Sequence, residues 1–202
     1  SLLGNLLNRY GKTYFSKKSH NNHFGVPLSL CNLEDDHQYG VFEIGMSKTG
    51  EIQKLSNLVK PYIGVITNIG EAHIENFDNL NGIAKAKSEI IKNINNDGFL
   101  ILNRDDKYFN YLSKIAKKKK IKTLSFGLNK KSNACLIKNK KYQNHNLLHL
   151  RILNENIFLK IKKTNSTNIL NILSSLLILS LLNLNLFKIL KLIYFLNSIE
   201  GR

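Results

Sequence analysis

A cluster of polar side chains follows an apolar run near the middle of the sequence. The run, residues 62–66, is rich in β-branched residues and has the length of a strand. The residues after it include Asn68, Glu71, His73 and Glu75. A buried parallel strand that ends in polar residues is typical of α/β active sites, where the ligand lies beyond the carboxyl ends of the strands. The alternative is an ordinary strand followed by a solvated loop.

Another carboxylate lies near the end of a different predicted strand. Glu43 stands among apolar neighbours in residues 40–44, so the sequence predicts that it is buried and needs a cation, a metal or a hydrogen-bond partner. Upstream, Asn21 and Asn22 form part of a polar loop that closes on an apolar helix start. Their carboxamides can donate to and accept from a sugar or a pyrophosphate. The alternative is that they are turn-forming asparagines.

One lysine falls on the apolar side of a predicted helix. The helix covers residues 80–95, and its apolar stripe is formed by Ile83, Ala84, Ile90, Ile91 and Ile94. Lys87 lies within this stripe, whereas Lys85 is about 200° away around the helix. The sequence therefore predicts a partly buried Lys87 and a solvated Lys85. Burial disfavours the charged form of a lysine, so a buried lysine indicates a specific interaction or role.

The elements that would position these side chains alternate between strands and helices. Strands are predicted at residues 13–15, 40–44, 62–66, 98–103 and 123–127, with helices between most of them. The strand at 98–103 also ends in polar residues, namely Asn103, Asp105 and Asp106. Residues 134–138 and 147–162 are predicted to form antiparallel hairpin strands. The expected fold is α/β, a doubly wound, mostly parallel sheet with a small appended antiparallel sheet.

Length and composition narrow the class of protein. The 202 residues suit one domain with at most a small attachment, and 43% hydrophobic residues are enough for a core. Cys31 and Cys135 lie far apart without a CxxC motif, which argues against a zinc site or a disulfide scaffold and fits a reducing cytoplasm. The net charge of +16 would suit nucleic acid or an anionic membrane. However, the lysines are spread along the chain and no aromatic platform accompanies them, so we predict no nucleic-acid partner.

The uncharged segment at residues 169–182 is nearly long enough to span a membrane. Asparagines within and beside it would be costly in lipid, and it lacks an aromatic belt. We therefore predict a helix buried in an α/β protein and no stable membrane insertion.

The tripeptide Gly11-Lys12-Thr13 suggests a phosphate-binding loop, but its context does not fit. The motif GxxxxGK[ST] requires four residues between its glycines and a helix after the lysine. Here six residues separate Gly4 from Gly11, and a strand-like segment follows. We therefore assign no phosphate-binding loop to this position.

Taken together, four blocks of the sequence resemble the central domain of the Mur ligases, and within that family the branch that adds D-alanyl-D-alanine. The blocks are residues 21–28, 41–52, 65–77 and 83–91. The resemblance runs from about Leu2 to Arg202 and is weak over residues 107–163. In this family the phosphate loop precedes the helix that corresponds to residues 2–10. We therefore expect residues 1–202 to be a central ATP-binding domain without that loop, ending at the junction to a C-terminal domain and inactive alone.

The resemblance implies an ATP-dependent ligase that adds D-alanyl-D-alanine to UDP-N-acetylmuramoyl-tripeptide through an acyl phosphate, during peptidoglycan precursor synthesis. It also implies a cytoplasmic monomer that uses ATP and Mg²⁺. The lysine that matches Lys87 is carbamylated in the family, and it would act with Glu43 and His73 in catalysis and metal binding. The residues implied in nucleotide binding are Asn103, Asn165, Asn168 and Arg202. Those implied in substrate binding are Asn21, Asn22, Thr67 and Asn68.

Two alternatives stay open at this point. The first is a related ATP-dependent ligase, either another Mur-type enzyme or a folylpolyglutamate-type synthase, and domains outside this chain would decide the substrate. The second is a basic nucleic-acid-binding module, which a salt-dependent shift with duplex DNA at physiological ionic strength would favour.

Overall fold

The computed structural model describes residues 1–17, 20–71 and 74–196, without the side chain of residue 196. Its backbone divides into two compact units. Unit 1 comprises Ser1, Gly11–Leu102 and Asp106–Leu124, and unit 2 comprises Leu2–Tyr10, Asn103–Asp105 and the chain from Ser125 onward. His73 and Arg202 lie outside the described residues.

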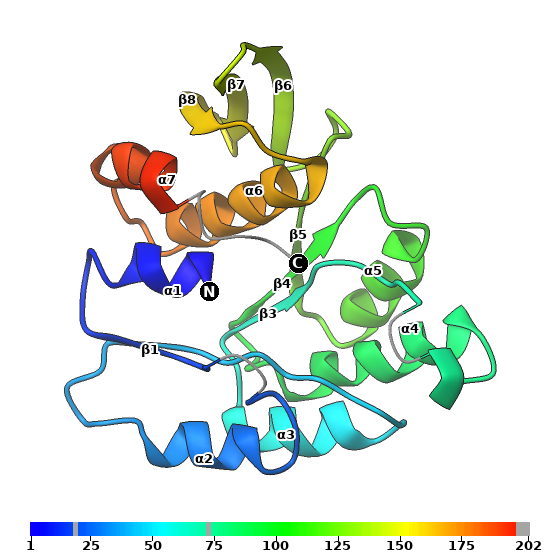
Figure 1. Ribbon diagram of the computed structural model, residues 1–202. Coiled ribbons are helices and arrows are strands. Elements are labelled where there is room, and N and C mark those ends of the chain that lie inside the picture. Colours follow the sequence, from blue (N-terminus) through cyan, green and yellow to red (C-terminus); the bar gives the residue numbers. More distant parts are fainter. Residues whose placement is uncertain (18–19, 72–73, 197–202) are drawn as a thin grey trace. The chain divides into compact units, whose positions relative to one another are not determined.

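Strands and helices alternate along unit 1 (Figure 1). In order they are β1 (Thr13–Phe15), α2 (Gly25–Cys31), β2 (Tyr39–Val41), α3 (Glu51–Val59), β3 (Ile63–Ile66), η1 (Ile74–Asn76), α4 (Leu80–Ser88), η2 (Glu89–Asn93), β4 (Phe99–Asn103), α5 (Phe109–Lys118) and β5 (Lys122–Gly127). The last residue of β4 and the second half of β5 belong to unit 2. β1 pairs with β2 in parallel, and β3 pairs with β4 in parallel with Ile66 opposite Leu102. Because β3 and β4 are parallel, the chain leaves both at the same edge of the sheet.

One hydrophobic core holds unit 1 together. It joins alternate residues of β4 to the inner faces of α3, α4, η2 and α5; members include Ile52, Ile83, Leu100 and Leu112. Ile83, Ala84 and Ile91 of the predicted stripe are fully buried, and Ile94 is nearly so. The helical periodicity read from the sequence therefore identified the buried face of α4.

Unit 2 combines an antiparallel sheet with a buried helix. Its elements are α1 (Leu2–Leu7), β6 (Ala134–Lys141), β7 (His145–Ile152), β8 (Glu155–Lys162), α6 (Ser166–Leu181), η3 (Leu186–Ile189) and α7 (Leu190–Leu196). β6, β7 and β8 pair antiparallel, and the end of β5 pairs with β6 in parallel. α6 packs against β6 and β7, and α7 packs against β8. The strand order of the six-stranded sheet is β3-β4-β5-β6-β7-β8.

This architecture confirms the predicted fold class, a mostly parallel α/β sheet with an antiparallel addition. It differs in detail at residues 80–95, where α4 ends at Ser88 and the chain continues as the 3₁₀ helix η2. Ser88 Oγ donates a hydrogen bond to the carbonyl of Lys85 at this point, and tightening to 3₁₀ geometry is common at helix ends. None of the described helices combines the length and the apolar character that crossing a membrane requires.

Candidate functional site

Lys87 lies on the inner side of α4 and contacts the loop after β3. Its side chain is half-buried, while that of Lys85 is exposed, which confirms the predicted difference between the two lysines. Lys87 Nζ donates a hydrogen bond to the carbonyl oxygen of Asn68 at 2.8 Å. Burial lowers the pKa of Lys87, and the nearby negative charge of Asp106 partly opposes this. The balance raises the fraction of neutral amine at a given pH.

The peptide group between Asn68 and Ile69 is held at both ends. Its carbonyl accepts from Lys87 Nζ, and its N–H donates to Asp106 Oδ2 at 2.6 Å. The other carboxylate oxygen of Asp106 accepts from the N–H of Tyr108 at 2.8 Å. Hydrogen bonds to charged groups are stronger than neutral ones. The loop that follows β3 is therefore fixed beside the Lys87 amine.

Glu43 is exposed, and the prediction that it is buried within a strand was wrong. β2 ends at Val41, so Glu43 belongs to the loop beyond the strand. Asn21 Nδ2 donates to Glu43 Oε1 at 3.3 Å, and the carbonyl of Asn21 accepts from the N–H of Gly45 at 2.7 Å. The structure therefore brings two predicted site residues, Asn21 and Glu43, into contact.

Two glutamates that carry no predicted role hold the chain around the start of α3. The buried carboxylate of Glu89 accepts from the N–H groups of Gly50 at 2.7 Å and Gln53 at 3.1 Å. Glu51 accepts from Ser47 N–H at 2.6 Å, and this bond is the main reason that the pKa of Glu51 is lowered. Glu89 was detectable in principle, because it is a carboxylate within the buried part of the Lys87 segment.

The remaining predicted residues of unit 1 have local roles. Thr67 and Asn68 are exposed, and Thr67 Oγ1 donates to Asn68 Oδ1 at 3.2 Å. Asn22 Oδ1 accepts from the N–H groups of Phe24 and Gly25, which helps to start α2. Here the alternative interpretation of Asn22 as a turn-forming residue describes what its side chain oxygen does.

The predicted nucleotide residues that the structure describes belong to unit 2. Asn103 is buried, and its Oδ1 accepts from the N–H of Asp105 at 3.0 Å. Asn165 caps α6 by accepting from Asn168 N–H at 2.9 Å, and Asn168 Nδ2 donates to Thr164 Oγ1 at 2.7 Å. Their contacts with a nucleotide stay a prediction, as do those of Arg202.

Glu43 and Lys87 fit a divalent cation as ligands only if Lys87 is carbamylated. The exposed Glu43 offers carboxylate oxygens, which magnesium prefers. Lys87 cannot ligate a cation as an ammonium, but a carbamate on Nζ would add two oxygens. His73 lies outside the described residues.

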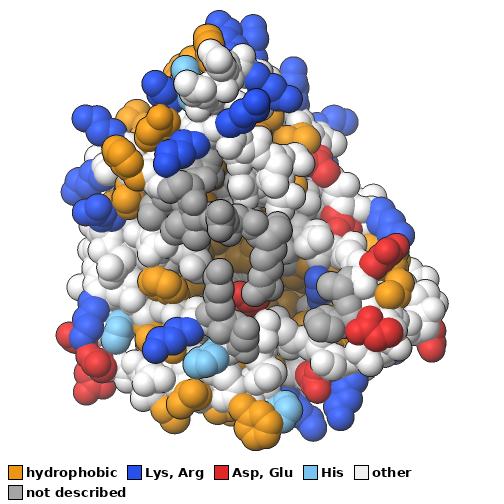
Figure 2. Space-filling view, viewed as in Figure 1, with side chains coloured by type: hydrophobic (Ala, Val, Ile, Leu, Met, Phe, Trp, Pro, Cys, Tyr) orange, Lys and Arg blue, Asp and Glu red, His pale blue; other side chains and the backbone are white. Residues whose placement is uncertain are grey.

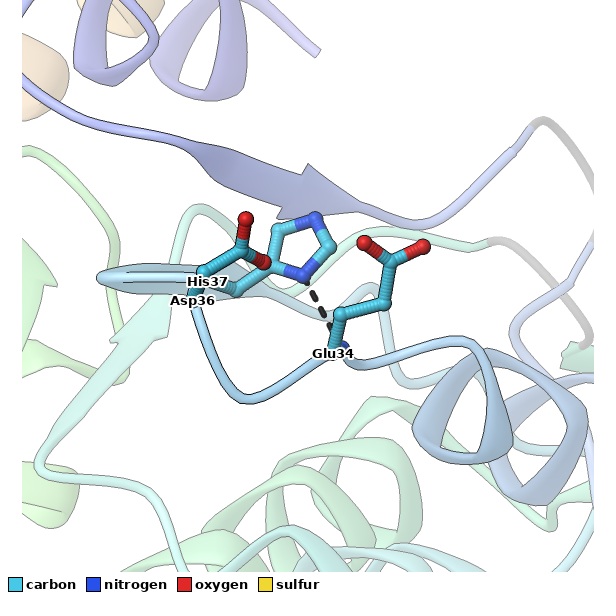
Figure 3. Close-up of side chains that lie close together, drawn as sticks. All are labelled: Glu34, Asp36 and His37. Carbon is cyan, nitrogen blue, oxygen red and sulfur yellow. Dashed lines mark hydrogen bonds between the residues drawn. The ribbon is translucent and has the colours of Figure 1, made fainter.

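A different group, Glu34, Asp36 and His37, has potential ligand atoms within 4.8 Å of one another (Figure 3). The ammonium of Lys12 contacts the carboxylates of Glu34 and Asp36, with the Asp36 contacts at 2.7 and 2.8 Å. The N–H of Glu34 donates to His37 Nδ1 at 2.9 Å. These contacts tie the start of β1 to the loop before β2 and already satisfy the acidic groups.

A shallow cavity of about 440 Å³ borders the N-terminal end of α4 in unit 1. Its lining includes Asp78, Asn81, Lys107 and Tyr108. Tyr108 OH donates to Asn81 Oδ1 at 2.7 Å, and Lys107 Nζ lies 5.1 Å from the centre of the Tyr108 ring. The lining therefore carries charges of both signs.

Lysine and arginine side chains (blue) lie at many places on the face drawn in Figure 2, and several are next to one another near the top of the view. Their wide distribution agrees with their spread along the sequence.

The parallel strands, the polar loops at their carboxyl ends and the half-buried lysine match a known class of protein. Residues 1–179 match the family model described as Mur ligase middle domain, and the chain belongs to this family. The resemblance inferred from the sequence blocks is thereby confirmed.

Individual relatives narrow the comparison. The chain is similar to UDP-N-acetylmuramoyl-tripeptide--D-alanyl-D-alanine ligase of Rickettsia prowazekii, with 37% identity over 149 residues that cover 73% of this chain and 33% of the relative. The ligase of the same name from Buchnera aphidicola (Acyrthosiphon pisum strain) is 36% identical over 151 residues, which cover 75% of this chain and 31% of the relative. The chain thus spans about a third of the length of these relatives.

Solved structures agree with the sequence relatives. A crystal structure of MurF from Acinetobacter baumannii has a TM-score of 0.89 and 28% identity, covering 100% of this chain and 43% of that one. A MurF ligase from Thermotoga maritima in complex with ADP has a TM-score of 0.85 and 25% identity, covering 100% of this chain and 45% of that one.

Proposed function

We propose that the protein is an ATP-dependent ligase that adds D-alanyl-D-alanine to UDP-N-acetylmuramoyl-tripeptide in peptidoglycan precursor synthesis. The observation that carries this proposal is the 37% identity to the Rickettsia prowazekii ligase of that name over 73% of the chain. The half-buried Lys87 beside the loop after β3 supports it, because this residue is the one that the family resemblance assigns to carbamylation.

The reaction divides into two steps. A carboxylate oxygen of the tripeptide attacks the γ-phosphorus of ATP, and the bond from this phosphorus to the β-phosphate oxygen breaks. ADP departs, and the tripeptide carboxylate has become an acyl phosphate. The amine of D-alanyl-D-alanine then attacks the acyl carbon, loses a proton and displaces phosphate, which leaves a new amide. Phosphoryl transfer depends mainly on positioning and charge neutralisation. Bound Mg²⁺ supplies part of that neutralisation.

Lys87 is assigned the role of an anionic ligand after modification. The neutral Nζ attacks carbon dioxide, an N–C bond forms, the electrons of one C–O π bond move to oxygen, and one proton leaves the nitrogen. Burial favours this step because it lowers the pKa of Lys87 and so raises the fraction of neutral amine, which is the form that reacts. Glu43, His73 and the carbamylated Lys87 would hold the metal.

Asn21, Asn22, Thr67 and Asn68 are assigned to the substrate. Asn103, Asn165, Asn168 and Arg202 are assigned to the nucleotide, and the ADP named for the Thermotoga maritima structure supports nucleotide binding in this family. The contact of Asn21 with Glu43 supports the link between substrate and metal residues.

Phosphate release by the full-length protein tests the proposal. With ATP and Mg²⁺ present, release should require both D-alanyl-D-alanine and UDP-N-acetylmuramoyl-tripeptide. Release with a folate and glutamate, or with a free amino acid in place of D-alanyl-D-alanine, would instead support the related-ligase alternative. No release with any of these substrates would refute a ligase function.

A further inference from the structure

We infer that Asp106 is a positioning residue for Lys87, acting through the peptide group between Asn68 and Ile69. This inference rests on the proposed function, because it concerns how the carbamate of Lys87 is oriented.

Asp106 and Lys87 hold opposite ends of one peptide group. Asp106 Oδ2 accepts the N–H of Ile69 at 2.6 Å, and the carbonyl of the same peptide accepts from Lys87 Nζ at 2.8 Å. A peptide group is planar, so holding its N–H also sets the direction of its carbonyl. An acceptor at one end polarises the group and strengthens acceptance at the other. Asp106 therefore controls the hydrogen bond that Lys87 makes without touching its amine directly.

After carbamylation, the end of the Lys87 side chain would be a planar group. A lysine carbamate keeps one hydrogen on Nζ, and its N–C bond has the partial double-bond character of an amide. The N–H and the two carboxylate oxygens therefore share one plane. If the N–H donates to the Asn68 carbonyl, as Nζ does in the structure, the plane of the carbamate is fixed. Its oxygens are then held in one orientation before any ligand arrives.

Asp106 is itself held in place by two backbone N–H groups. Its Oδ1 accepts from the N–H of Tyr108 at 2.8 Å, next to the start of α5, while its Oδ2 holds Ile69. Asp106 is half-buried, and the Ile69 side chain beside the bond is buried in the core of unit 1. The carboxylate therefore links the loop after β3 to the N-cap residue of α5.

The adjacent Asp105 provides a matched control. Its carboxylate also accepts two backbone N–H groups, those of Leu128 and Asn129, but these belong to unit 2 and do not include the Lys87 loop. Asp105→Ala and Asp106→Ala thus remove the same kind of interaction from neighbouring positions. Only the second releases the Asn68–Ile69 peptide.

The experiment measures carbamate and turnover separately in the full-length protein. ¹³C NMR with labelled bicarbonate gives carbamate per protein, and phosphate release gives turnover. For Asp106→Ala we expect a retained carbamate signal and little change in the KM for ATP. Turnover should fall by roughly tenfold, which is the size expected for one lost hydrogen bond to a charged group. Asp105→Ala should keep both the signal and the turnover per carbamate. A purely structural role would instead lower both measurements together.

The outcomes separate this inference from the proposed function. Wild-type turnover per carbamate in Asp106→Ala would overturn the inference alone. Loss of the carbamate signal in a folded Asp106→Ala protein would also overturn it, since Asp106 would then govern formation rather than orientation. A wild-type protein without a carbamate would overturn the proposed role of Lys87 and the inference together. If Asp106→Ala does not fold, Asp106→Asn replaces it, because an NH₂ group, which cannot accept, then takes the place of one of the two carboxylate oxygens. Reduced turnover per carbamate supports the inference, and wild-type turnover overturns it.

Discussion

Replacing Lys87 with alanine should abolish most turnover with little effect on stability. If the carbamate is the oriented anion of the site, removing a preorganised electrostatic group of this kind lowers kcat by about 10²–10³-fold. The stability effect is the difference of two opposing terms. The variant loses the 2.8 Å bond to the Asn68 carbonyl, but it no longer has to bury a polar group at position 87. The free energy of unfolding should therefore change by less than about 2 kcal/mol.

Lys85→Ala is the control for this prediction. Lys85 has the same side chain, lies two positions away and is exposed, so its removal should alter the free energy of unfolding by no more than about 0.5 kcal/mol and leave turnover unchanged. Phosphate release and urea unfolding of both variants measure the two effects. Acetate added to Lys87→Ala should restore part of the activity by occupying the vacated space. Equal losses in both variants, or a loss in Lys85→Ala alone, would show that the assignment of Lys87 is wrong.

Three further predictions concern the scaffold around the site. Glu89→Gln leaves one oxygen for the N–H groups of Gly50 and Gln53, so urea unfolding should show a loss of about 1–3 kcal/mol, and a wild-type midpoint would contradict the role of Glu89. Gly98→Ala should lower the free energy of unfolding by more than about 3 kcal/mol, because the new Cβ would lie 2.3 Å from the carbonyl oxygen of Tyr62. Gly50 has a φ of +91° and no atom within 4 Å of the Cβ position, so Gly50→Ala should cost only the backbone strain of about 1–2 kcal/mol. The reverse ranking of the two variants in thermal unfolding would refute the steric argument. Hydrogen bonds from Ser47 and Lys48 lower the pKa of Glu51. The stability that ionised Glu51 gives to the fold is therefore present above the usual glutamate pKa of about 4.3 and is lost as the pH falls through the lowered value. Glu51→Gln should remove this part of the acid sensitivity in thermal melts from pH 6 downward.

Most of the fold followed from local patterns in the sequence. The period of apolar residues predicted α4 and its buried face, including the difference between Lys85 and Lys87, because helical geometry fixes which side chains share a face. The apolar runs predicted β3 and β4, and the bounds of β1 were predicted to the residue. The alternation of strands and helices predicted the α/β class. These features depend on neighbours in the chain, so the sequence alone was sufficient.

The contacts of the site depended on tertiary structure. Glu43 was predicted to be buried because its neighbours are apolar, but β2 ends at Val41 and leaves it exposed beside Asn21. Asp106 was visible only as a polar residue after a strand, and nothing local indicates that it holds the same peptide as Lys87, 19 residues before it. Glu89 likewise reaches Gly50 across 39 positions. Such contacts arise when parallel strands and their following helices bring distant loops to one edge of a sheet, and that depends on how the whole unit packs.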